Sequence, residues 1–321
     1  MIIHNTEILE GQRAVVKIPV GELPSGNRIN IHAHIFRSKE PGPCILLLGG
    51  VHGDEINGVE IIRRALVGRF FDNLQRGSVI AIPLLNIYGF IHFSRDVPDG
   101  KDVNRSFPGN AAGSLASRVA RLITKKILPH INFGIDFHTG GRHYYNYPQI
   151  RYSAEDPFAE TLARAFGTPV IVAAKPLGKS LRKTAQEMGK TILTFEGGES
   201  LRYDGFSIEH ALGGLRRLLA SQHMLPAEDG PIASPLSFKQ SGWVRAPRAG
   251  LFLWSKCAGH PVVEGEPLGE INDPFGHSSY TIYAPHGGYI IGHNNAPVIN
   301  QGDALFHIAY QGANGLDDSE E

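Results

Sequence analysis

The sequence is organised around the stretch Gly49-Gly50-Val51-His52-Gly53-Asp54-Glu55. It follows an apolar run at residues 44–48 and precedes an amphipathic segment at residues 59–71. The glycines allow a sharp turn, because glycine adopts positive φ without a steric cost. His52 offers an imidazole nitrogen and Glu55 a carboxylate oxygen, and both are ordinary zinc ligands. At this spacing, directly after a strand, the two side chains can reach one small cation together.

Length and composition place the chain among globular proteins. Its 321 residues are 42% hydrophobic and 19% charged, enough for one large or two ordinary domains. Lys plus Arg and Asp plus Glu number 31 each, so the formal net charge is zero. That balance gives no support for nucleic acid or a membrane surface as the main partner. We expect a small-molecule partner, and the sequence leaves homo-oligomerisation open.

Cysteine usage and the N-terminal residues bear on the compartment. Cys44 and Cys257 lie far apart, and they show neither a disulfide framework nor a cysteine-type zinc site. The first residues lack the basic region and apolar core of a signal peptide. No apolar run approaches the roughly 20 residues that span a bilayer. A soluble, cytoplasmic protein is therefore expected.

Periodic segments up to residue 225 predict an α/β domain over residues 1–225. The strand at 44–48, the helix that follows it and the strand at 78–82 form a strand–helix–strand unit. Residues 86–110 have little periodicity and predict a long active-site loop. Arg95 and Arg105 are the cations of this loop, and arginine can pair a carboxylate through two hydrogen bonds. Taken alone, these arginines would be interpreted as solvent-exposed.

Two later strands also end in metal-compatible or acid–base side chains beside glycines. His138 follows a strand at 132–137, and Glu196 follows a strand at 191–195. The ligand crevice of an α/β sheet lies at the carboxyl ends of its strands, so His138 occupies a position equivalent to that of His52. Asp136 could orient an imidazole, or it could be an ordinary buried, hydrogen-bonded aspartate. The three strand ends together favour a metal-dependent site.

Residues 236–311 differ in character from the rest, because they are rich in glycine and proline and show no helical period. Residues 245–252 resemble 283–290, and residues 262–271 resemble 299–308. Two such halves resemble a barrel-sandwich hybrid, the fold of lipoyl and biotinyl carriers. The segment between them, 272–281, contains no lysine, so a swinging-arm role is not expected. We expect a linker at 226–235, a small all-β domain at 236–311 and a flexible tail at 312–321.

Four motifs carry a resemblance to a known family. They are Gly-Val-His52-Gly-Asp-Glu55, Val-Asn104-Arg105-Ser-Phe-Pro-Gly, Asp-Phe-His138-Thr-Gly-Gly and Phe-Glu196-Gly-Gly. As an ordered set they resemble the succinylglutamate desuccinylase/aspartoacylase family, a branch of the zinc carboxypeptidase fold. The resemblance covers roughly residues 40–225, and it implies a mixed central sheet with helices on both faces and a small β domain that caps the site.

The resemblance also implies a cofactor and residue roles. One Zn²⁺ per chain would be held by His52, Glu55 and His138, with water in the fourth position. Glu196 matches the family's general base, and Arg95 is similar to the arginine that polarises the scissile carbonyl.

The remaining implied residues bind substrate. Asn104 and Arg105 match the pair that binds the substrate carboxylate. In some family members a tyrosine of the β domain also reaches the substrate. Tyr283 is the candidate here, and Tyr289 is the alternative.

The predicted function is a zinc-dependent amidohydrolase that removes an acyl group from an N-acylated amino acid or a related small carboxylate. A metallo-carboxypeptidase that trims a C-terminal residue is the first alternative, because it would use the same zinc site and carboxylate anchor. A non-catalytic binding module is the second. The intact Glu196 argues against it, since a structural zinc site uses four protein ligands and no base. The sequence does not identify the acyl group.

Overall fold

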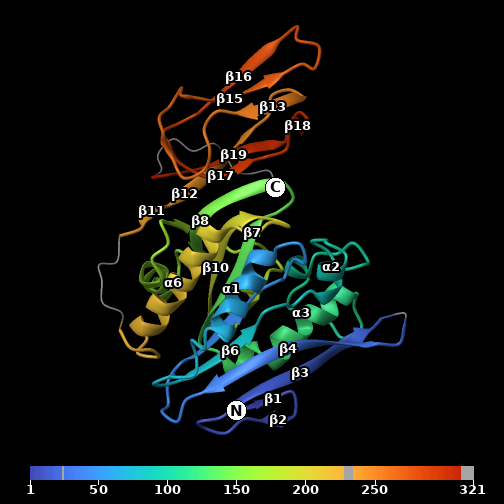
Figure 1. Ribbon diagram of the computed structural model, residues 1–321, viewed down its shortest axis with the longest axis vertical. Helices are drawn as coiled ribbons and strands as arrows, with labels where there is room; N and C mark the ends of the chain where they lie inside the picture. The colour runs from blue at the N-terminus through green and yellow to red at the C-terminus, as the bar shows by residue number, and fades with distance from the viewer. Residues whose placement is uncertain (24, 228–233, 312–321) are drawn as a thin grey trace.

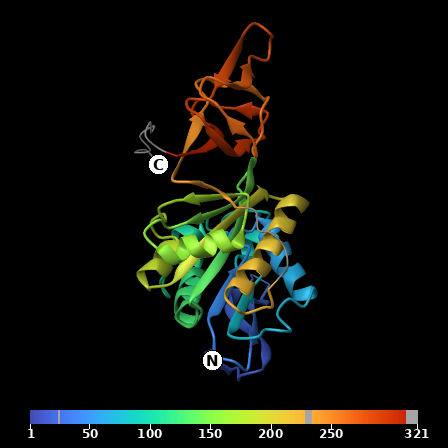
Figure 2. The ribbon, with the colours of Figure 1, turned by 90° about the vertical axis from the view of Figure 1, so that its left-hand side faces the viewer.

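The computed structural model describes residues 1–23, 25–227 and 234–311. These residues form a larger α/β lobe and a smaller all-β lobe, which lie one above the other (Figure 1, Figure 2). The N-terminus lies at the end of the molecule away from the small lobe. The predicted tail at 312–321 and residues 228–233 of the predicted linker fall outside the described residues.

The α/β lobe contains helices of very different lengths between its strands. The helices are α1 (Ile56–Val67), α2 (Ile87–Ile91), η1 (Val103–Arg105), α3 (Leu115–Lys126), η2 (Leu128–His130), α4 (Pro157–Phe166), α5 (Leu181–Glu187) and α6 (Gly205–Ser221). The strands are β1 (Ile2–Ile3), β2 (Thr6–Glu7), β3 (Arg13–Glu22), β4 (Arg28–Arg37), β5 (Cys44–Leu48), β6 (Ser78–Ile82), β7 (Phe133–Gly140), β8 (Tyr144–Tyr152), β9 (Val170–Ala173) and β10 (Thr191–Glu199). No helix among the described residues is long and apolar enough to cross a membrane.

One mixed sheet runs through both lobes in the order β12-β19-β17-β8-β10-β7-β5-β6-β4-β3. Its strands β12 (Gln240–Arg245), β19 (Ala304–Tyr310) and β17 (Gly288–Asn294) belong to the small lobe. Strands β10, β7, β5 and β6 are parallel to one another. Beyond β6, strand β4 pairs antiparallel with β6, and β3 pairs antiparallel with β4. Strand β8 is antiparallel to β10, and its other edge carries β17 of the small lobe. The carboxyl ends of β5, β7 and β10 therefore lie side by side.

Strand β5 shows how the sheet is buried on both faces. All five of its residues are buried. Leu46 and Leu48 belong to a core that includes residues of α3 and α5, whereas Ile45 and Leu47 belong to a core that includes residues of α1, α4 and α6. Successive side chains of a strand point to opposite faces, so helices cover both sides. This confirms the predicted α/β fold with a mixed central sheet.

The small lobe is built from two similar halves and confirms the predicted all-β region. Its strands are β12 (Gln240–Arg245), β13 (Gly250–Trp254), β14 (Pro261–Val262), β15 (Pro267–Asn272), β16 (Ser279–Tyr283), β17 (Gly288–Asn294), β18 (Val298–Ile299) and β19 (Ala304–Tyr310). Strand β13 pairs with β18 and β14 pairs with β17, so each half completes the other. Leu268 and Leu305, which correspond in the sequence repeat, are both fully buried in its core.

Two strands connect the lobes in ways that the sequence pattern did not predict. Strand β11 (Leu236–Phe238) falls in the range expected for the small domain, yet it pairs with β9 of the larger lobe. Strand β8 falls where no strand is expected, because it contains Pro148, and proline is uncommon in central strands. Strand β8 lies between β10 and β17 and so joins the larger lobe to the small lobe.

Candidate active site

His52, Glu55 and His138 converge at the ends of the adjacent strands β5 and β7. All three are buried, and their ligand atoms lie within 4.8 Å of one another. His52 Nδ1 lies 2.7 Å from Glu55 Oε1, and His138 Nδ1 lies 2.8 Å from Glu55 Oε2. The two Nδ1 atoms are 3.2 Å apart. The structure thus brings together the three residues that the sequence predicts as metal ligands.

The turn that carries His52 and Glu55 depends on glycine. Gly50 has φ +58°, a conformation that favours glycine. A Cβ atom on Gly53 would lie 2.0 Å from the carbonyl carbon of Gly89 in α2, so this helix packs directly on the turn. The backbone N–H of Glu55 donates to the His52 carbonyl. Close packing therefore fixes both side chains at the mouth of β5.

The outer nitrogen of each histidine faces a further carboxylate. His52 Nε2 lies 3.2 Å from Asp102 Oδ1, and His138 Nε2 lies 2.8 Å from Asp136 Oδ2. A carboxylate in this position keeps the imidazole proton on Nε2 and directs the Nδ1 lone pair inward. Asp136 forms a close ion pair with His138, although no hydrogen bond joins them among the described residues, and from this position it could orient the imidazole. Asp102 occupies the corresponding position behind His52, and no sequence pattern around it predicts this contact.

The charges of the cluster stabilise one another. Burial alone would lower the pKa of His52 and of His138, but the neighbouring carboxylates outweigh it and raise both. Burial alone would raise the pKa of Glu55, but the two histidines hold it well below its ordinary value. The site therefore favours positive charge between its donors, which a bound cation can supply in place of protons.

The donor set fits a divalent metal ion. Zn–N bonds of about 2.0–2.1 Å at tetrahedral angles separate two nitrogen ligands by roughly 3.3 Å. The two Nδ1 atoms are 3.2 Å apart. Two histidines and one carboxylate also form a known donor set of catalytic zinc sites, which keep one position open. Other divalent ions can use the same set.

Arg95 reaches the cluster from the loop after α2. Its Nη1 lies 3.2 Å from Glu55 Oε1 and 3.2 Å from His52 Nδ1. Its Nη2 donates to Asp102 Oδ2 at 2.9 Å. Burial would raise the pKa of Asp102, but His52 and Arg95 hold it well below its ordinary value. Asp102 therefore joins Arg95 to the cluster.

Glu196 lies on β10 in register with His138 on β7. The pairing of β10 shifts directly after Glu196, which marks a β-bulge, and bulges beside active sites commonly redirect a side chain. Within the bulge, Gly198 has φ +83°, and a Cβ there would lie 2.3 Å from Asn57 Nδ2. Asn57 donates from this nitrogen to the Gly197 carbonyl. Helix α1 thus holds the bulge that sets the direction of Glu196.

Asn104 and Arg105 lie in the short helix η1, whose N-terminal cap is Asp102. Asn104 Oδ1 accepts a hydrogen bond from the backbone N–H of Leu181 at 2.9 Å, so its NH₂ group is the end that could contact a carboxylate. Arg105 is exposed, and its Nη1 donates to the Asn104 carbonyl. Within the described residues, Arg105 makes no hydrogen bond to the histidine cluster. Among the described residues, the connection of this pair to the cluster runs through Asp102, which accepts a hydrogen bond from the Asn104 backbone N–H and contacts His52.

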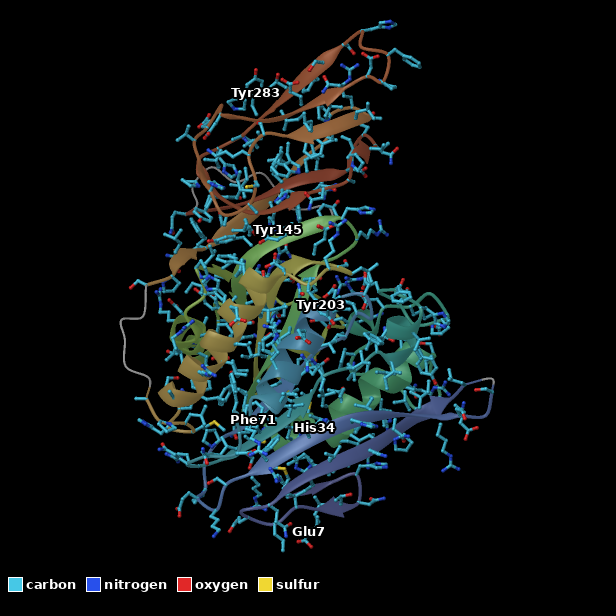
Figure 3. The ribbon with its side chains drawn as sticks, viewed as in Figure 1. Glu7, His34, Phe71, Tyr145, Tyr203 and Tyr283 are labelled. Carbon is cyan, nitrogen blue, oxygen red and sulfur yellow. The ribbon has the colours of Figure 1, made fainter. Side chains whose placement is uncertain are left out.

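The tyrosine candidates of the small lobe lie away from the cluster. Tyr283 is on β16 of the outer four-stranded sheet, and it is 56% exposed. Figure 3 shows it far from the junction of the lobes, whereas Tyr145 lies at that junction. The Tyr289 hydroxyl donates to the Gly259 carbonyl within the small lobe. The structure does not bring either candidate to the site.

Sequence reasoning missed Arg182 on α5. Its Nη2 donates to the Lys175 carbonyl, and its Nη1 is buried without a partner among the described residues. Burial, with Arg151, lowers the pKa of Arg182 to about 10, although Glu196 and Asp136 favour its charged form. A guanidinium with an unused donor in this position suits a substrate carboxylate. No local pattern around it distinguishes it from an ordinary helix arginine.

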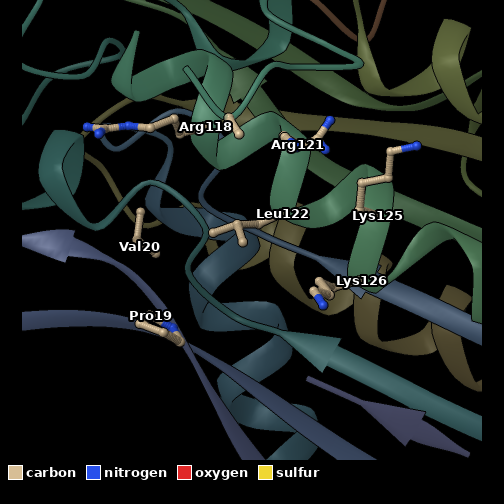
Figure 4. Close-up of a pocket in the computed structure, with 8 residues that line it drawn as sticks. Pro19, Val20, Arg118, Arg121, Leu122, Lys125 and Lys126 are labelled. Carbon is tan, nitrogen blue, oxygen red and sulfur yellow. The ribbon is translucent and has the colours of Figure 1, made fainter. Parts of the chain in front are cut away.

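A separate cavity of about 470 Å³ lies between β3 and α3 (Figure 4). Its lining residues are Pro19, Val20, Ala111, Arg118, Arg121, Leu122, Lys125 and Lys126. None of the predicted site residues lines it, and Arg118 and Lys125 point in different directions. The lining offers cations and apolar surface but no acid–base pair.

The site residues lie within a stretch that matches a known family. Residues 41–222 match the model of the succinylglutamate desuccinylase/aspartoacylase catalytic domain. The chain belongs to this family. Among curated proteins, the N-alpha-acetyl-L-2,4-diaminobutyric acid deacetylase of Halomonas elongata is 26% identical over 315 residues, which cover 93% of this chain and 91% of the relative. Membership in the desuccinylase/aspartoacylase family supports a deacylating hydrolase.

Solved structures share the fold across both lobes. A succinylglutamate desuccinylase/aspartoacylase from Rhodobacter sphaeroides has a TM-score of 0.84 and 25% identity, covering 97% of this chain and 100% of that one. The product-bound ectoine utilization protein EutE from Ruegeria pomeroyi has a TM-score of 0.83 and 23% identity, covering 94% of this chain and 95% of that one. The small lobe is therefore part of the layout that this chain shares with them.

Proposed function

We propose that this protein is a zinc-dependent amidohydrolase that removes the acyl group from an N-acylated amino acid or a related small carboxylate. The observation that carries the proposal is the convergence of the His52 and His138 Nδ1 atoms on Glu55, with Glu196 in register on the next strand. The family match and the Halomonas elongata deacetylase support the substrate class.

The metal would be held by His52, Glu55 and His138. Bound there, Zn²⁺ would supply Lewis acidity toward the amide carbonyl and would lower the pKa of a water molecule to about 7. Asp102, through a hydrogen bond, and Asp136, through an ion pair, would orient the two imidazoles at their outer nitrogens. These two carboxylates would therefore set how tightly the metal is held.

Glu196 would act as the general base. It would accept a proton from the attacking water and deliver it to the leaving amine, a task suited to a positioned carboxylate. Its Oε2 accepts a hydrogen bond from Asn146 Nδ2 at 2.9 Å, which leaves Oε1 for the proton transfer. The bulge in β10 opposite β7 would hold the carboxylate in this orientation.

Cations of the site would bind the two ends of the substrate. Arg95 would donate to the carbonyl oxygen as it gains negative charge, a contribution of about 3 kcal/mol for one donor. Asn104 and Arg105 would bind the free carboxylate, and this contact would fix the position of the amide. Arg182, with its unused buried donor, is a second candidate for an anionic group of the substrate.

The decisive experiment is hydrolysis of a panel of N-acyl amino acids by purified protein, with zinc quantified in the same sample. The panel includes N-acetyl-diaminobutyrate, N-acetyl-aspartate, N-succinyl-glutamate and C-terminal dipeptides. We expect release of an acyl acid from at least one N-acyl amino acid, loss of turnover with a chelator, and recovery on addition of zinc.

Other outcomes would point to the alternatives. Cleavage of dipeptides alone would establish a metallo-carboxypeptidase. One zinc per chain without turnover on any member of the panel would favour a binding module. A folded protein that binds no divalent metal would remove the basis of the proposal.

A further inference from the structure

Asn146 is a buried residue of β8 that contacts Glu196. Its side chain is 5% exposed, and its Nδ2 donates to Glu196 Oε2 at 2.9 Å. A hydrogen bond from an amide to an ionised carboxylate belongs to the stronger class of hydrogen bonds. The contact joins residues that are 50 positions apart in the sequence, so it depends on the pairing of β8 with β10.

The β-bulge explains why Asn146 occupies this position. On β8, Gln149 faces Glu196, so a regular antiparallel ladder would place Tyr147 opposite Gly198. The register shift, which adds one residue to β8 at this point, places Asn146 there instead. A shift of one residue exchanges the side chains that point to each face of a strand. The bulge therefore brings an amide, in place of a tyrosine ring, to the face that carries Glu196.

On its other edge, Asn146 is covered by the small lobe. It faces Gly292 of β17, and a Cβ atom on Gly292 would lie 2.8 Å from Asn146 Oδ1. Gly292 does not have positive φ, so close approach, and not backbone conformation, is what requires glycine here. Strand β17 thus packs against Oδ1 of the Asn146 amide, while Nδ2 of the same amide donates to Glu196.

Further hydrogen bonds hold β17 in this place. Gln149 Nε2 donates to the Ile291 carbonyl at 3.1 Å. Beyond the end of the strand, the Asn295 backbone N–H donates to the His143 carbonyl at 2.7 Å, and its Nδ2 donates to Glu199 Oε2 at 2.8 Å. These contacts lie on both sides of Gly292 along the chain. The position of β17 relative to Asn146 is therefore fixed at two points.

We propose that Asn146 is a positioning residue for Glu196, and that β17 of the small lobe keeps the Asn146 amide in place through the close approach of Gly292. The inference rests on the proposed function, because it assigns a role to a neighbour of the general base. It makes the small lobe a structural part of the proton-transfer apparatus, in addition to any cover that the lobe gives the site.

The test compares Asn146→Ala and Gly292→Ala with the matched control Gly242→Ala. Gly242 lies on β12 of the same sheet, and a Cβ there would come no closer than 3.8 Å to any atom, the nearest being in the Tyr310 ring. We expect kcat to fall about 10- to 100-fold in Asn146→Ala and about 5- to 20-fold in Gly292→Ala, since small misplacements of catalytic groups are costly. KM, zinc content and thermal stability should stay close to those of the control.

The double variant distinguishes a coupled role from two separate ones. If Gly292 acts through Asn146, then Gly292→Ala should change kcat less than twofold in the Asn146→Ala background, because effects on one contact do not add. Multiplicative effects would overturn the coupling. Unchanged kcat in Asn146→Ala would overturn the positioning role.

A crystal structure of Gly292→Ala gives a readout that needs no activity. We expect the Asn146 amide to move and its distance to Glu196 Oε2 to exceed 3.5 Å, compared with 2.9 Å in the parent chain. A retained hydrogen bond would overturn the proposal. Because this readout is independent of turnover, it separates a failure of this inference from an inactive wild-type protein, which would instead count against the proposed function. If Gly292→Ala does not fold, the kcat of Asn146→Ala still decides the positioning role.

Discussion

Each lobe buries a pair of histidines, and the two pairs have opposite surroundings. In the larger lobe, His52 and His138 face carboxylates, which raise the pKa of both. In the small lobe, burial lowers the pKa of His293 to about 4 and that of His307 well below its ordinary value. His307 stacks on Trp243, with ring centroids 4.2 Å apart and planes inclined by 14°.

The comparison shows that burial alone does not make a histidine a metal ligand. Both pairs are about equally buried, at 3–5% exposure. A histidine beside carboxylates sits where positive charge is stabilised, so it can exchange a proton for a cation. A histidine among aromatic rings stays neutral and contributes packing. The sequence contains fifteen histidines, and only their partners in the fold separate these two uses.

The largest effect should come from His138→Ala. We expect kcat/KM to fall by about 10³-fold or more, since the metal supplies several kcal/mol of charge stabilisation. Zinc content should fall with it, as measured by elemental analysis of the dialysed protein. The counterpart His307→Ala should reduce stability yet leave zinc content and the turnover of the folded fraction intact. Equal loss of zinc in both variants would break the comparison.

Glu196→Gln should separate proton transfer from metal binding. We expect kcat to fall about 10²- to 10⁴-fold, the range for loss of a general base, while zinc content stays at the wild-type level. Glu187→Gln is the control, because its carboxylate is exposed on α5. Full turnover in Glu196→Gln with zinc still bound would show that another group takes the proton.

Asp136→Asn should weaken metal binding without removing a ligand. The loss of the carboxylate behind His138 Nε2 should lower zinc affinity about 10- to 100-fold, as measured by competition with a chromophoric chelator. Asp102→Asn should act in the same direction through His52. Unchanged affinity in both variants would show that the outer carboxylates do not hold the imidazoles.

His293→Gln should show how the lowered pKa of a small-lobe histidine makes the stability of the folded protein depend on pH. The pKa of His293 lies near 4 in the folded state and at about 6.5 in the unfolded state, so the unfolded chain binds the proton more readily between these values. Its contribution to stability is fully present above pH 6.5 and is lost as pH falls toward 4, by about 3 kcal/mol. Urea unfolding across this range should therefore have a flatter pH dependence in His293→Gln. The same pH dependence of the unfolding free energy in wild type and in His293→Gln would contradict this prediction.

The strand-end residues could be predicted from sequence because local patterns carry them. A buried apolar run followed by glycine and a ligand side chain marks the carboxyl end of a strand, which is how His52, His138 and Glu196 stand out. Asp102, Arg182 and Asn146 could not be found in this way. Asp102 and Asn146 contact groups that are distant in sequence, as with the Asn146 contact to Glu196, and the unused donor of Arg182 is recognised only from its burial in the fold.

Strand β8 was missed for a related reason. Pro148 and a run of tyrosines resemble a loop locally, and only the pairing with β10 and β17 makes the segment a central strand. The internal repeat did predict the small all-β lobe. It could not show which edge of the larger sheet the lobe would extend, because strand pairing between distant segments leaves no periodic signal in either one.

The pairing of β8 with β17 can form only late in synthesis, because β17 is translated long after β8. His52, Glu55, His138 and Glu196 are all translated well before β17, and at about 5–20 residues per second the interval lasts seconds. During that time residues 144–146 of β8, which later pair with β17, have unpaired N–H and C=O groups, and such edges recruit other strands. The nascent protein therefore has a short open strand edge near the histidine cluster, and a chain terminated before Gly288 would keep that edge open permanently.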